Sequence, residues 1–252
     1  MCIFYKNVIL MARNPAYDAR LLLARVKNTQ NSRWKGFPLS NPLHILDQLV
    51  AHGVVPVVRT STADFARTSV AWLKEAGFRT FEITMTIPDA PDLIAELSKD
   101  TELMIGAGTV FTAADADRVV AAGARYVVSP CVSAEVGAAC RRLGVPSLMG
   151  TLTPTEVFHA LQAGSTAVKV FPASTVGVGH LKALRSVFPK VIFMPTGGVD
   201  ASTVGDWVKA GAACVGVGGK LVDEGLIKAG DKDTVLKVGK QLIEAYKAAK
   251  KG

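Results

Sequence analysis

Residues 146–172 read PSLMGTLTPTEVFHALQAGSTAVKVFP, and this stretch decides the fold class. Two short apolar runs, Pro146–Thr151 and Ala167–Pro172, flank a segment that carries the signals of a helix. The segment opens with Thr153, continues with a proline at the first helical position and a glutamate placed for a capping box, and ends before Gly164. A strand, a helix and a second strand in this order predict a parallel pair joined by a helical crossover.

The same alternation continues along most of the chain, with apolar runs at a spacing of roughly 20 residues. Eight strands that are each followed by a helix predict a (β/α)₈ TIM barrel in the α/β class. A preceding helix begins at Asn41-Pro42, carries Ile45, Leu46 and Leu49 on one face, and is expected to cap one end of the barrel. The predicted strands are Val54–Arg59, Thr80–Met85, Met104–Val110, Tyr126–Pro130, Pro146–Thr151, Ala167–Pro172, Val191–Gly198 and Cys214–Gly219.

Length and charge divide the chain into two parts. Its 252 residues, of which 49% are hydrophobic, suit one barrel of roughly 250 residues. Residues 1–36 contain seven Lys or Arg and one Asp, so most of the net charge of +8 lies there. We expect a basic extension over residues 1–36, outside the fold, and the barrel over residues 37–252. An Arg-rich, acid-poor extension also partly fits a mitochondrial targeting peptide.

Several classes of protein find little support in the composition. The part after residue 36 has no basic stripe with interleaved aromatic residues, which argues against a nucleic-acid partner. The four cysteines and four histidines form no CxxC, HxH or HExxH pattern, so we expect no disulfide framework and no metal site. No apolar run reaches the roughly 18 residues of a membrane span. Reduced thiols in a cytoplasmic protein are the simplest interpretation.

Active sites of such barrels lie where the strands end, so polar residues at those positions are the first candidates. Strand alternation gives the direction of two of them. Phe81, Ile83 and Met85 share one face of their strand, which should meet the helices, and this leaves Glu82 and Thr84 facing inward. The candidates at the strand ends are Arg59, Glu82, Thr84, Thr109, Ser129, Lys169, Thr196, Gly197, Gly198, Gly218 and Gly219.

The same parity turns Lys169 inward, because Val168 and Val170 occupy the outward positions. Burial disfavours the charged ammonium and so favours a neutral amine that can attack a ketone and form an imine. In the alternative interpretation, Lys169 reaches the rim and pairs with a carboxylate, and Glu82 is its salt-bridge partner. Beside an imine, Glu82 could instead move protons during bond cleavage.

Two glycine pairs suggest an anion site. Gly197-Gly198 and Gly218-Gly219 follow the seventh and eighth predicted strands, where loops of TIM barrels often hold phosphate through backbone N–H groups and a helix N-terminus. The alternative is that these are tight turns that need glycine.

Five motifs follow one another over roughly residues 40–250. They are Glu82-Ile83-Thr84, Gly106-Ala107-Gly108-Thr109-Val110, Ser129-Pro130, Lys169-Val170-Phe171-Pro172-Ala173 and Pro195-Thr196-Gly197-Gly198. In this order they resemble the 2-keto-3-deoxy-6-phosphogluconate (KDPG) aldolase family. The resemblance implies a homotrimer without a cofactor, in which Lys169 forms a Schiff base with pyruvate and Glu82 is the general acid and base. It implies a pyruvate pocket lined by Thr109, Pro130 and Phe171, and a phosphate site at Gly197, Gly198 and the loop at Gly219.

The chain departs from the gluconate branch of that family at two positions, with Thr86 in place of an arginine and Gly219 in place of a serine. Arg59 and Pro88 match the galactonate branch, whereas Thr196 resembles the gluconate branch. The missing arginine makes Arg59 the candidate anchor for the substrate carboxylate. In the alternative, Arg59 pairs with Glu82 and orients it.

The leading prediction is cleavage of KDPG to pyruvate and glyceraldehyde 3-phosphate. The alternatives are an aldolase for 2-keto-3-deoxy-6-phosphogalactonate, or an aldolase for 4-hydroxy-2-oxoglutarate (KHG) or oxaloacetate decarboxylase that would share the imine but need no phosphate. A different class would be a phosphate-binding isomerase or epimerase barrel, or a sugar-phosphate-binding barrel without catalysis.

Overall fold

The computed structural model describes residues 42–251, so the predicted basic extension and the predicted N-cap Asn41 lie outside the described residues. Eight parallel strands follow one another in the order β7-β6-β5-β4-β3-β2-β1-β8. A bridge between Thr196 and Gly216 brings the two outer strands together, which makes the ring nearly closed. The predicted TIM barrel is confirmed. The strands are β1 Val54–Val58, β2 Thr80–Thr84, β3 Met104–Gly108, β4 Val127–Ser129, β5 Ser147–Thr151, β6 Ala167–Val170, β7 Phe193–Pro195 and β8 Val215–Val217.

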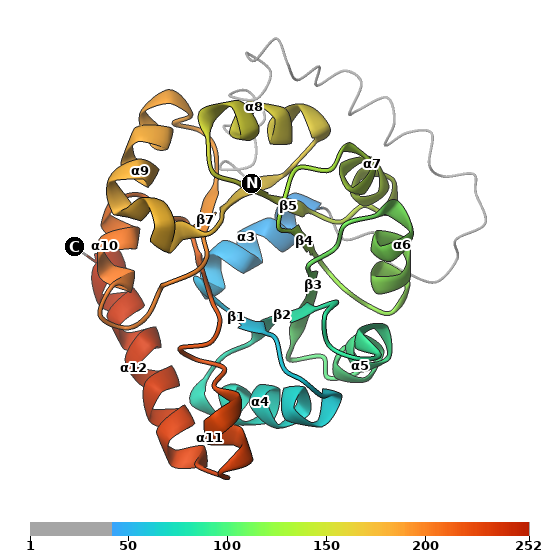
Figure 1. Ribbon diagram of the computed structural model, residues 1–252, viewed down its shortest axis with the longest axis vertical. Coiled ribbons are helices and arrows are strands. Elements are labelled where there is room, and N and C mark those ends of the chain that lie inside the picture. Colours follow the sequence, from blue (N-terminus) through green and yellow to red (C-terminus); the bar gives the residue numbers. More distant parts are fainter. Residues whose placement is uncertain (1–41, 252) are drawn as a thin grey trace, which may run out of the picture. The chain divides into compact units, whose positions relative to one another are not determined.

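Helices surround this ring of strands, and one helix, α3, crosses the ring (Figure 1). Each strand is followed by at least one helix, as the sequence predicts. The helices are α3 Pro42–His52, α4 Ala63–Ala76, α5 Ala90–Leu97, α6 Ala113–Ala121, α7 Ala134–Leu143, α8 Pro154–Ala163, α9 Ala173–Val187, α10 Val204–Lys209, α11 Glu224–Lys228 and α12 Lys232–Lys251.

Local signals in the sequence set the ends of several helices. In α8 the Thr153 side chain accepts a hydrogen bond from the Glu156 N–H, the Glu156 side chain accepts from the Thr153 N–H, and Gly164 ends the helix with a left-handed φ of 92°. At the start of α6, the Thr112 side chain accepts a hydrogen bond from the Asp115 N–H. These caps satisfy backbone groups that a helix end otherwise leaves without partners.

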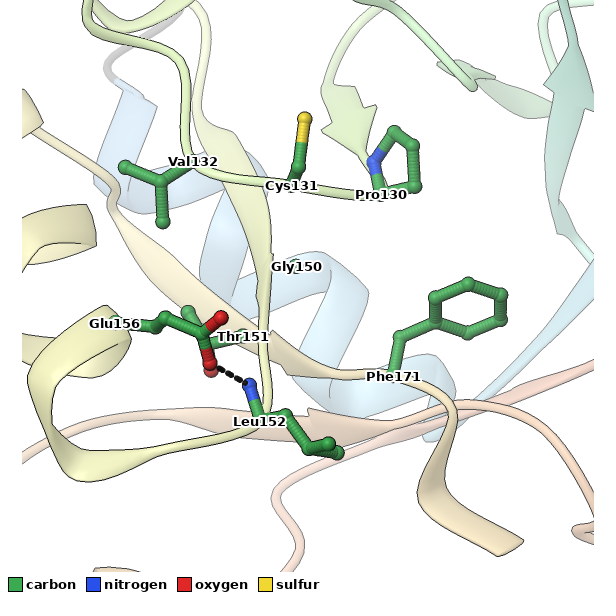
Figure 2. A pocket seen from close by; sticks show the side chains of 8 residues that line it. All are labelled: Pro130, Cys131, Val132, Gly150, Thr151, Leu152, Glu156 and Phe171. Atoms are coloured by element: carbon green, nitrogen blue, oxygen red, sulfur yellow. Dashed lines mark hydrogen bonds between the residues drawn. The ribbon is translucent and has the colours of Figure 1, made fainter. Parts of the chain in front are cut away.

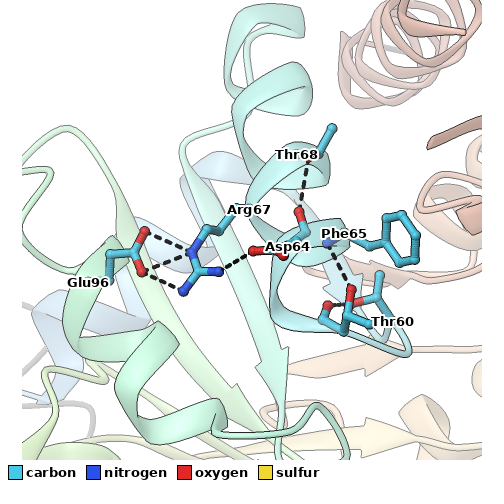
Figure 3. Close-up of polar contacts among 7 residues, drawn as sticks. Thr60, Asp64, Phe65, Arg67, Thr68 and Glu96 are labelled. Carbon is cyan, nitrogen blue, oxygen red and sulfur yellow. Dashed lines mark hydrogen bonds and ion pairs between the residues drawn. The ribbon is translucent and has the colours of Figure 1, made fainter. Parts of the chain in front are cut away.

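Helix α4 is fixed at its start and along its exposed face (Figure 3). The Thr62 hydroxyl accepts a hydrogen bond from the Phe65 N–H and caps the helix. Arg67 then donates to Asp64 one turn earlier and to both carboxylate oxygens of Glu96 on α5. The guanidinium fork therefore joins two neighbouring helices of the outer layer, although exposed ion pairs of this kind contribute little to stability.

The outer core lies between the strands and the helices. Phe81 and Ile83 of β2 are fully buried in it, and so are Val168 and Val170 of β6. This is the face that strand alternation predicts for them. Met85 is partly buried against the same core.

A smaller inner core fills the amino-terminal end of the barrel. Ile45, Leu46 and Leu49 of α3 pack there against side chains that point into the ring, among them Tyr126 and Met194. The helix therefore closes that end of the barrel, as its apolar face predicts, and ligands must approach from the carboxyl ends of the strands.

All strands except β5 end earlier than the predicted runs. Thr109 has a left-handed φ of 61°, which is unfavourable in a strand, and it leaves the ladder directly after Gly108. Arg59, Phe171 and Thr196 likewise lie just beyond β1, β6 and β7. The candidate side chains are therefore held at the strand ends and in the first residues of the βα loops.

Candidate active site

A buried ion pair lies inside the barrel. Lys169 on β6 and Glu82 on β2 are 4% and 0% exposed, and 3.4 Å separates the lysine Nζ from the glutamate Oε1. The ring of Phe171 lies 5.0 Å from the same Nζ, which places an aromatic face beside the ammonium. The pairing that the sequence left open is present, but it lies in the interior and not at the rim. Two charges this deep are costly to bury even as a pair, because the loss of hydration can exceed their mutual attraction. Stability alone therefore does not explain the arrangement.

Glu82 has room only because position 108 is a glycine. A Cβ at Gly108 would lie 2.2 Å from Glu82 Oε1 and 2.6 Å from its Cγ. The second carboxylate oxygen, Oε2, is buried and has no hydrogen-bond partner within residues 42–251. One oxygen of Glu82 thus faces the lysine, and the other keeps its hydrogen-bonding capacity unused.

Tyr126 lies toward the closed end of the barrel, in the inner core. Its hydroxyl shares a hydrogen bond of 3.1 Å with Thr80, whose hydroxyl donates to the Met104 carbonyl. Burial raises the pKa of Tyr126 well above its usual range, and the charge of Glu82 adds to this. The phenol therefore stays neutral and serves as packing on the side of the pair away from the open end.

Arg59 forms no hydrogen bond or ion pair with Glu82. Its Nη2 donates to the Thr109 hydroxyl at 3.1 Å, across the mouth of the barrel from β1 to β3, whereas the Glu82 carboxylate pairs with Lys169. The guanidinium is exposed and forms no ion pair within the described residues. The hypothesis that Arg59 orients Glu82 through a direct ion pair therefore has no support in this geometry.

The Thr84 hydroxyl makes its hydrogen bonds to neighbouring residues of the barrel wall. Thr84 points inward as predicted and is fully buried, but its hydroxyl donates to the Val58 carbonyl at 3.0 Å and lies 2.9 Å from that of Thr86. Like Glu82, Lys169 and Thr109, it lines neither of the two cavities described next. Its hydroxyl links β1 to β2 below the mouth.

One cavity of about 280 Å³ opens at the carboxyl ends of β1, β7 and β8. Gly197 and Gly198 both have left-handed φ values, 100° and 73°, which a side chain would strain. The hydroxyl of Thr196 is buried without a hydrogen-bond partner among residues 42–251. The structure thus brings together most of the predicted binding residues here. The lining is formed by Val57, Arg59, Phe171, Thr196, Gly197, Gly198, Val199, Gly218, Gly219, Lys220 and Val222.

A second cavity, of about 310 Å³, lies at the ends of β4, β5 and β6. Figure 2 shows Pro130 and Phe171 on one side of it and Glu156 with Leu152 on the other. Backbone N–H groups of Leu152 and Thr153 donate to Glu156 and lower the pKa of its carboxyl, so this group is a charged helix cap. Phe171 lines both cavities, and Pro130 lies only in this one.

Two residues of the site were not among the sequence candidates. Thr151 lines the second cavity, and its hydroxyl donates to the Lys169 carbonyl at 3.4 Å. Lys220 lines the first cavity directly after the glycine pair at residues 218 and 219. Both could have been found, because Thr151 ends a predicted strand and Lys220 is a cation beside a predicted anion site.

Other reactive groups do not add a second centre within residues 42–251. No group of three or more His, Cys, Asp or Glu side chains there could hold a metal ion. Burial raises the pKa of the Cys140 and Cys214 thiols to about 12, so both stay protonated near neutral pH. None of the helices in this range is long and apolar enough to cross a membrane.

Comparison with known proteins places this arrangement in context. Residues 45–238 match the aldolase family described as "KDPG and KHG aldolase". The chain is 32% identical over 202 residues to the 2-dehydro-3-deoxy-phosphogluconate aldolase of Treponema pallidum, covering 79% of this chain and 96% of the relative. It is also 32% identical over 175 residues to the 2-dehydro-3-deoxy-6-phosphogalactonate aldolase of Escherichia coli K12, covering 68% and 85%.

A solved structure of similar shape is the KDPG aldolase of Legionella pneumophila with pyruvate captured as a covalent carbinolamine intermediate. The TM-score is 0.73 at 30% identity, and the match covers 81% of this chain and 98% of the Legionella chain.

Proposed function

Because the chain belongs to the KDPG and KHG aldolase family, we propose that it cleaves KDPG to pyruvate and glyceraldehyde 3-phosphate through an imine on Lys169. The buried pair of Lys169 and Glu82 is the observation that carries this proposal. Transfer of one proton within the pair gives a neutral amine next to a neutral carboxylic acid, which are the nucleophile and the acid that imine formation needs. A barrel that only bound its ligand would have no use for such a costly pair.

The first half of the reaction forms the imine. The Lys169 amine attacks the C2 keto carbon of the substrate and gives a carbinolamine. Protonation of its hydroxyl, with Glu82 as the donor, releases water and leaves a protonated imine. The ring of Phe171 faces the same nitrogen and favours the positive charge that develops there.

The second half breaks the carbon–carbon bond. Glu82 takes the proton of the C4 hydroxyl, the C3–C4 bond breaks, and its electron pair moves into the protonated imine to give an enamine. Glyceraldehyde 3-phosphate leaves. The enamine then takes a proton at C3, with Glu82 as the donor, and water releases pyruvate and the free amine. Glu82 Oε2, buried and without a partner among the described residues, is suited to hold the travelling proton.

Arg59 is the anchor for the substrate carboxylate in this proposal. An anion at the barrel mouth needs a compensating charge, and the guanidinium offers a permanent one with a fork that fits a carboxylate. Its single bond to Thr109 leaves other N–H groups for a ligand. Thr109 would then position the arginine and contribute its hydroxyl to the same end of the substrate.

Two related substrates compete with KDPG. The match to a phosphogalactonate aldolase, at the same 32% identity as the gluconate relative, keeps the C4 epimer open as an alternative. The glycine pairs and Lys220 in the first cavity favour a phosphorylated substrate over KHG, which carries no phosphate. We further propose a homotrimer in the cytoplasm. The half-exposed rings of Phe111 and Phe158 are surfaces that an assembly could cover.

Borohydride reduction in the presence of pyruvate tests the proposal. A stable adduct at Lys169, located by peptide mass mapping, is expected, together with pyruvate release from KDPG. The variant Lys190→Gln is the matched control, because this exposed lysine precedes β7 at the opposite end of the barrel. An adduct on another lysine, or no adduct, would overturn the imine mechanism.

A further inference from the structure

The turn after β8 presents one lysine to the first cavity. The Gly218 carbonyl accepts hydrogen bonds from the N–H groups of Leu221 at 2.8 Å and of Val222 at 2.9 Å. Leu221 and Val222 are buried, whereas Gly219 and Lys220, between them and Gly218, are exposed. The two hydrogen bonds to Gly218 and the burial of Leu221 and Val222 therefore fix the turn, while Gly219 and Lys220 face solvent.

The segment that follows the turn is also fixed. Asp223 caps α11 by accepting from the N–H groups of Gly225 and Leu226. Glu224 accepts from the Ser61 N–H at 2.8 Å and from the Ser61 hydroxyl at 2.5 Å, which ties α11 to the loop after Arg59. Both basic residues of the cavity are therefore attached to anchored backbone, so binding a ligand has to order their side chains but not the loops.

The cavity has the electrostatics of an anion site. Its lining contains Arg59 and Lys220 but no carboxylate. The Lys220 ammonium forms no ion pair within residues 42–251, and the N–H groups of Gly198, Gly219 and Lys220 donate to no residue in that range. Thr196, whose buried hydroxyl also has no partner there, belongs to the same lining.

The N-terminus of α9, which follows β6 beside the first cavity, does not supply N–H groups to this site. The Ala173 N–H donates to the Thr196 carbonyl, and the Ser174 N–H donates to the Gly197 carbonyl. These groups are therefore unavailable to an anion. Charge compensation has to come from the loops and their side chains.

We propose that Lys220 is the cation that recognises the substrate phosphate and makes the enzyme select phosphorylated over non-phosphorylated keto acids; this inference rests on the proposed function. A phosphate monoester carries a charge of about −1.5 to −2 near pH 7. Gly219 has no hydroxyl to offer it, and backbone N–H groups supply only partial charge. Lys220 supplies a full positive charge from the adjacent position, beside the free N–H groups of the turn.

The test compares Lys220→Gln with wild type and with Lys190→Gln, whose lysine is also exposed but lies at the opposite end of the barrel. Calorimetric titration with inorganic phosphate at low salt measures the site directly. Because Lys220 is exposed, we expect phosphate affinity to fall by roughly threefold to tenfold in Lys220→Gln. Lys190→Gln should match wild type, and Lys220→Arg should restore most of the affinity.

A second readout is the ratio of kcat/KM for KDPG to kcat/KM for 2-keto-3-deoxygluconate, which lacks the phosphate. This ratio should fall by a similar factor in Lys220→Gln only. Equal phosphate affinity in wild type and Lys220→Gln, or an unchanged ratio, would overturn the role of Lys220. Trapping of pyruvate on Lys169 involves no phosphate. A failed trapping experiment would therefore overturn the proposed function without affecting the phosphate titration, which decides the role of Lys220.

Discussion

Replacing Gly108 with alanine tests whether the position of Glu82 is essential for catalysis. The new methyl carbon would lie 2.2 Å from Glu82 Oε1, 2.6 Å from Cγ and 2.7 Å from Cδ. All three separations are far shorter than ordinary van der Waals contact. Glu82 is fully buried, so its side chain has to leave its position opposite Lys169 or β3 has to shift.

Two effects follow from this clash. Overpacking a well-filled interior should lower the free energy of unfolding by about 1–3 kcal/mol. If Glu82 is the general acid and base as proposed, displacing it should lower kcat by about 10²–10⁴-fold, which corresponds to roughly 3–5 kcal/mol in the activation barrier. The loss of activity should therefore exceed what the loss of stability explains.

Pyruvate release, coupled to NADH oxidation by lactate dehydrogenase, measures kcat, and urea unfolding measures stability. Gly179→Ala is the matched control, because a Cβ at that position in α9 meets no atom within 4 Å. It should be neutral or slightly stabilising, since alanine favours a helix over glycine. Wild-type turnover in a folded Gly108→Ala enzyme would refute the role proposed for Glu82.

Four further outcomes are expected. Arg59→Lys should weaken pyruvate binding and raise KM while leaving the pH dependence of kcat intact, because lysine lacks the planar fork. Unchanged pyruvate affinity together with a displaced pH profile of kcat would instead favour a role of Arg59 in orienting Glu82. Thr196→Val should reduce a preference for the gluconate epimer by about 0.5–1.5 kcal/mol in competition assays, the value of one hydrogen bond, and equal use of both epimers by wild type would contradict this. Deleting residues 1–36 should leave turnover nearly unchanged, and a large loss in a still-folded protein would show that the extension belongs to the site or the assembly. Hydrogen bonds from Ser61 and from Lys228 lower the pKa of Glu224 from 4.5 to about 2, so the stabilising effect of its carboxylate is present above pH 4.5 and is lost as the pH falls toward 2. The free energies of unfolding of wild type and Glu224→Gln should therefore converge over that range, and a difference that stays constant with pH would contradict the assignment.

The sequence by itself determined the barrel and the direction of its main reactive groups. Apolar runs of strand length, threonine caps and glycine stops are local signals, and the side-chain direction in a strand alternates with period two. Phe81 and Val168 therefore had to face the helices, and Glu82 and Lys169 had to face inward. These inferences need no knowledge of how distant strands are aligned.

Only the tertiary structure decided which inward groups meet and which remain free for a ligand. Lys169 pairs with Glu82 from the opposite side of the ring, whereas Arg59 donates to Thr109 and not to Glu82. The Thr84 hydroxyl donates to the Val58 carbonyl. Such contacts join residues far apart in the chain. Their distances depend on the stagger of eight strands around the ring and on the space that residues such as Gly108 leave, and a local sequence pattern specifies neither.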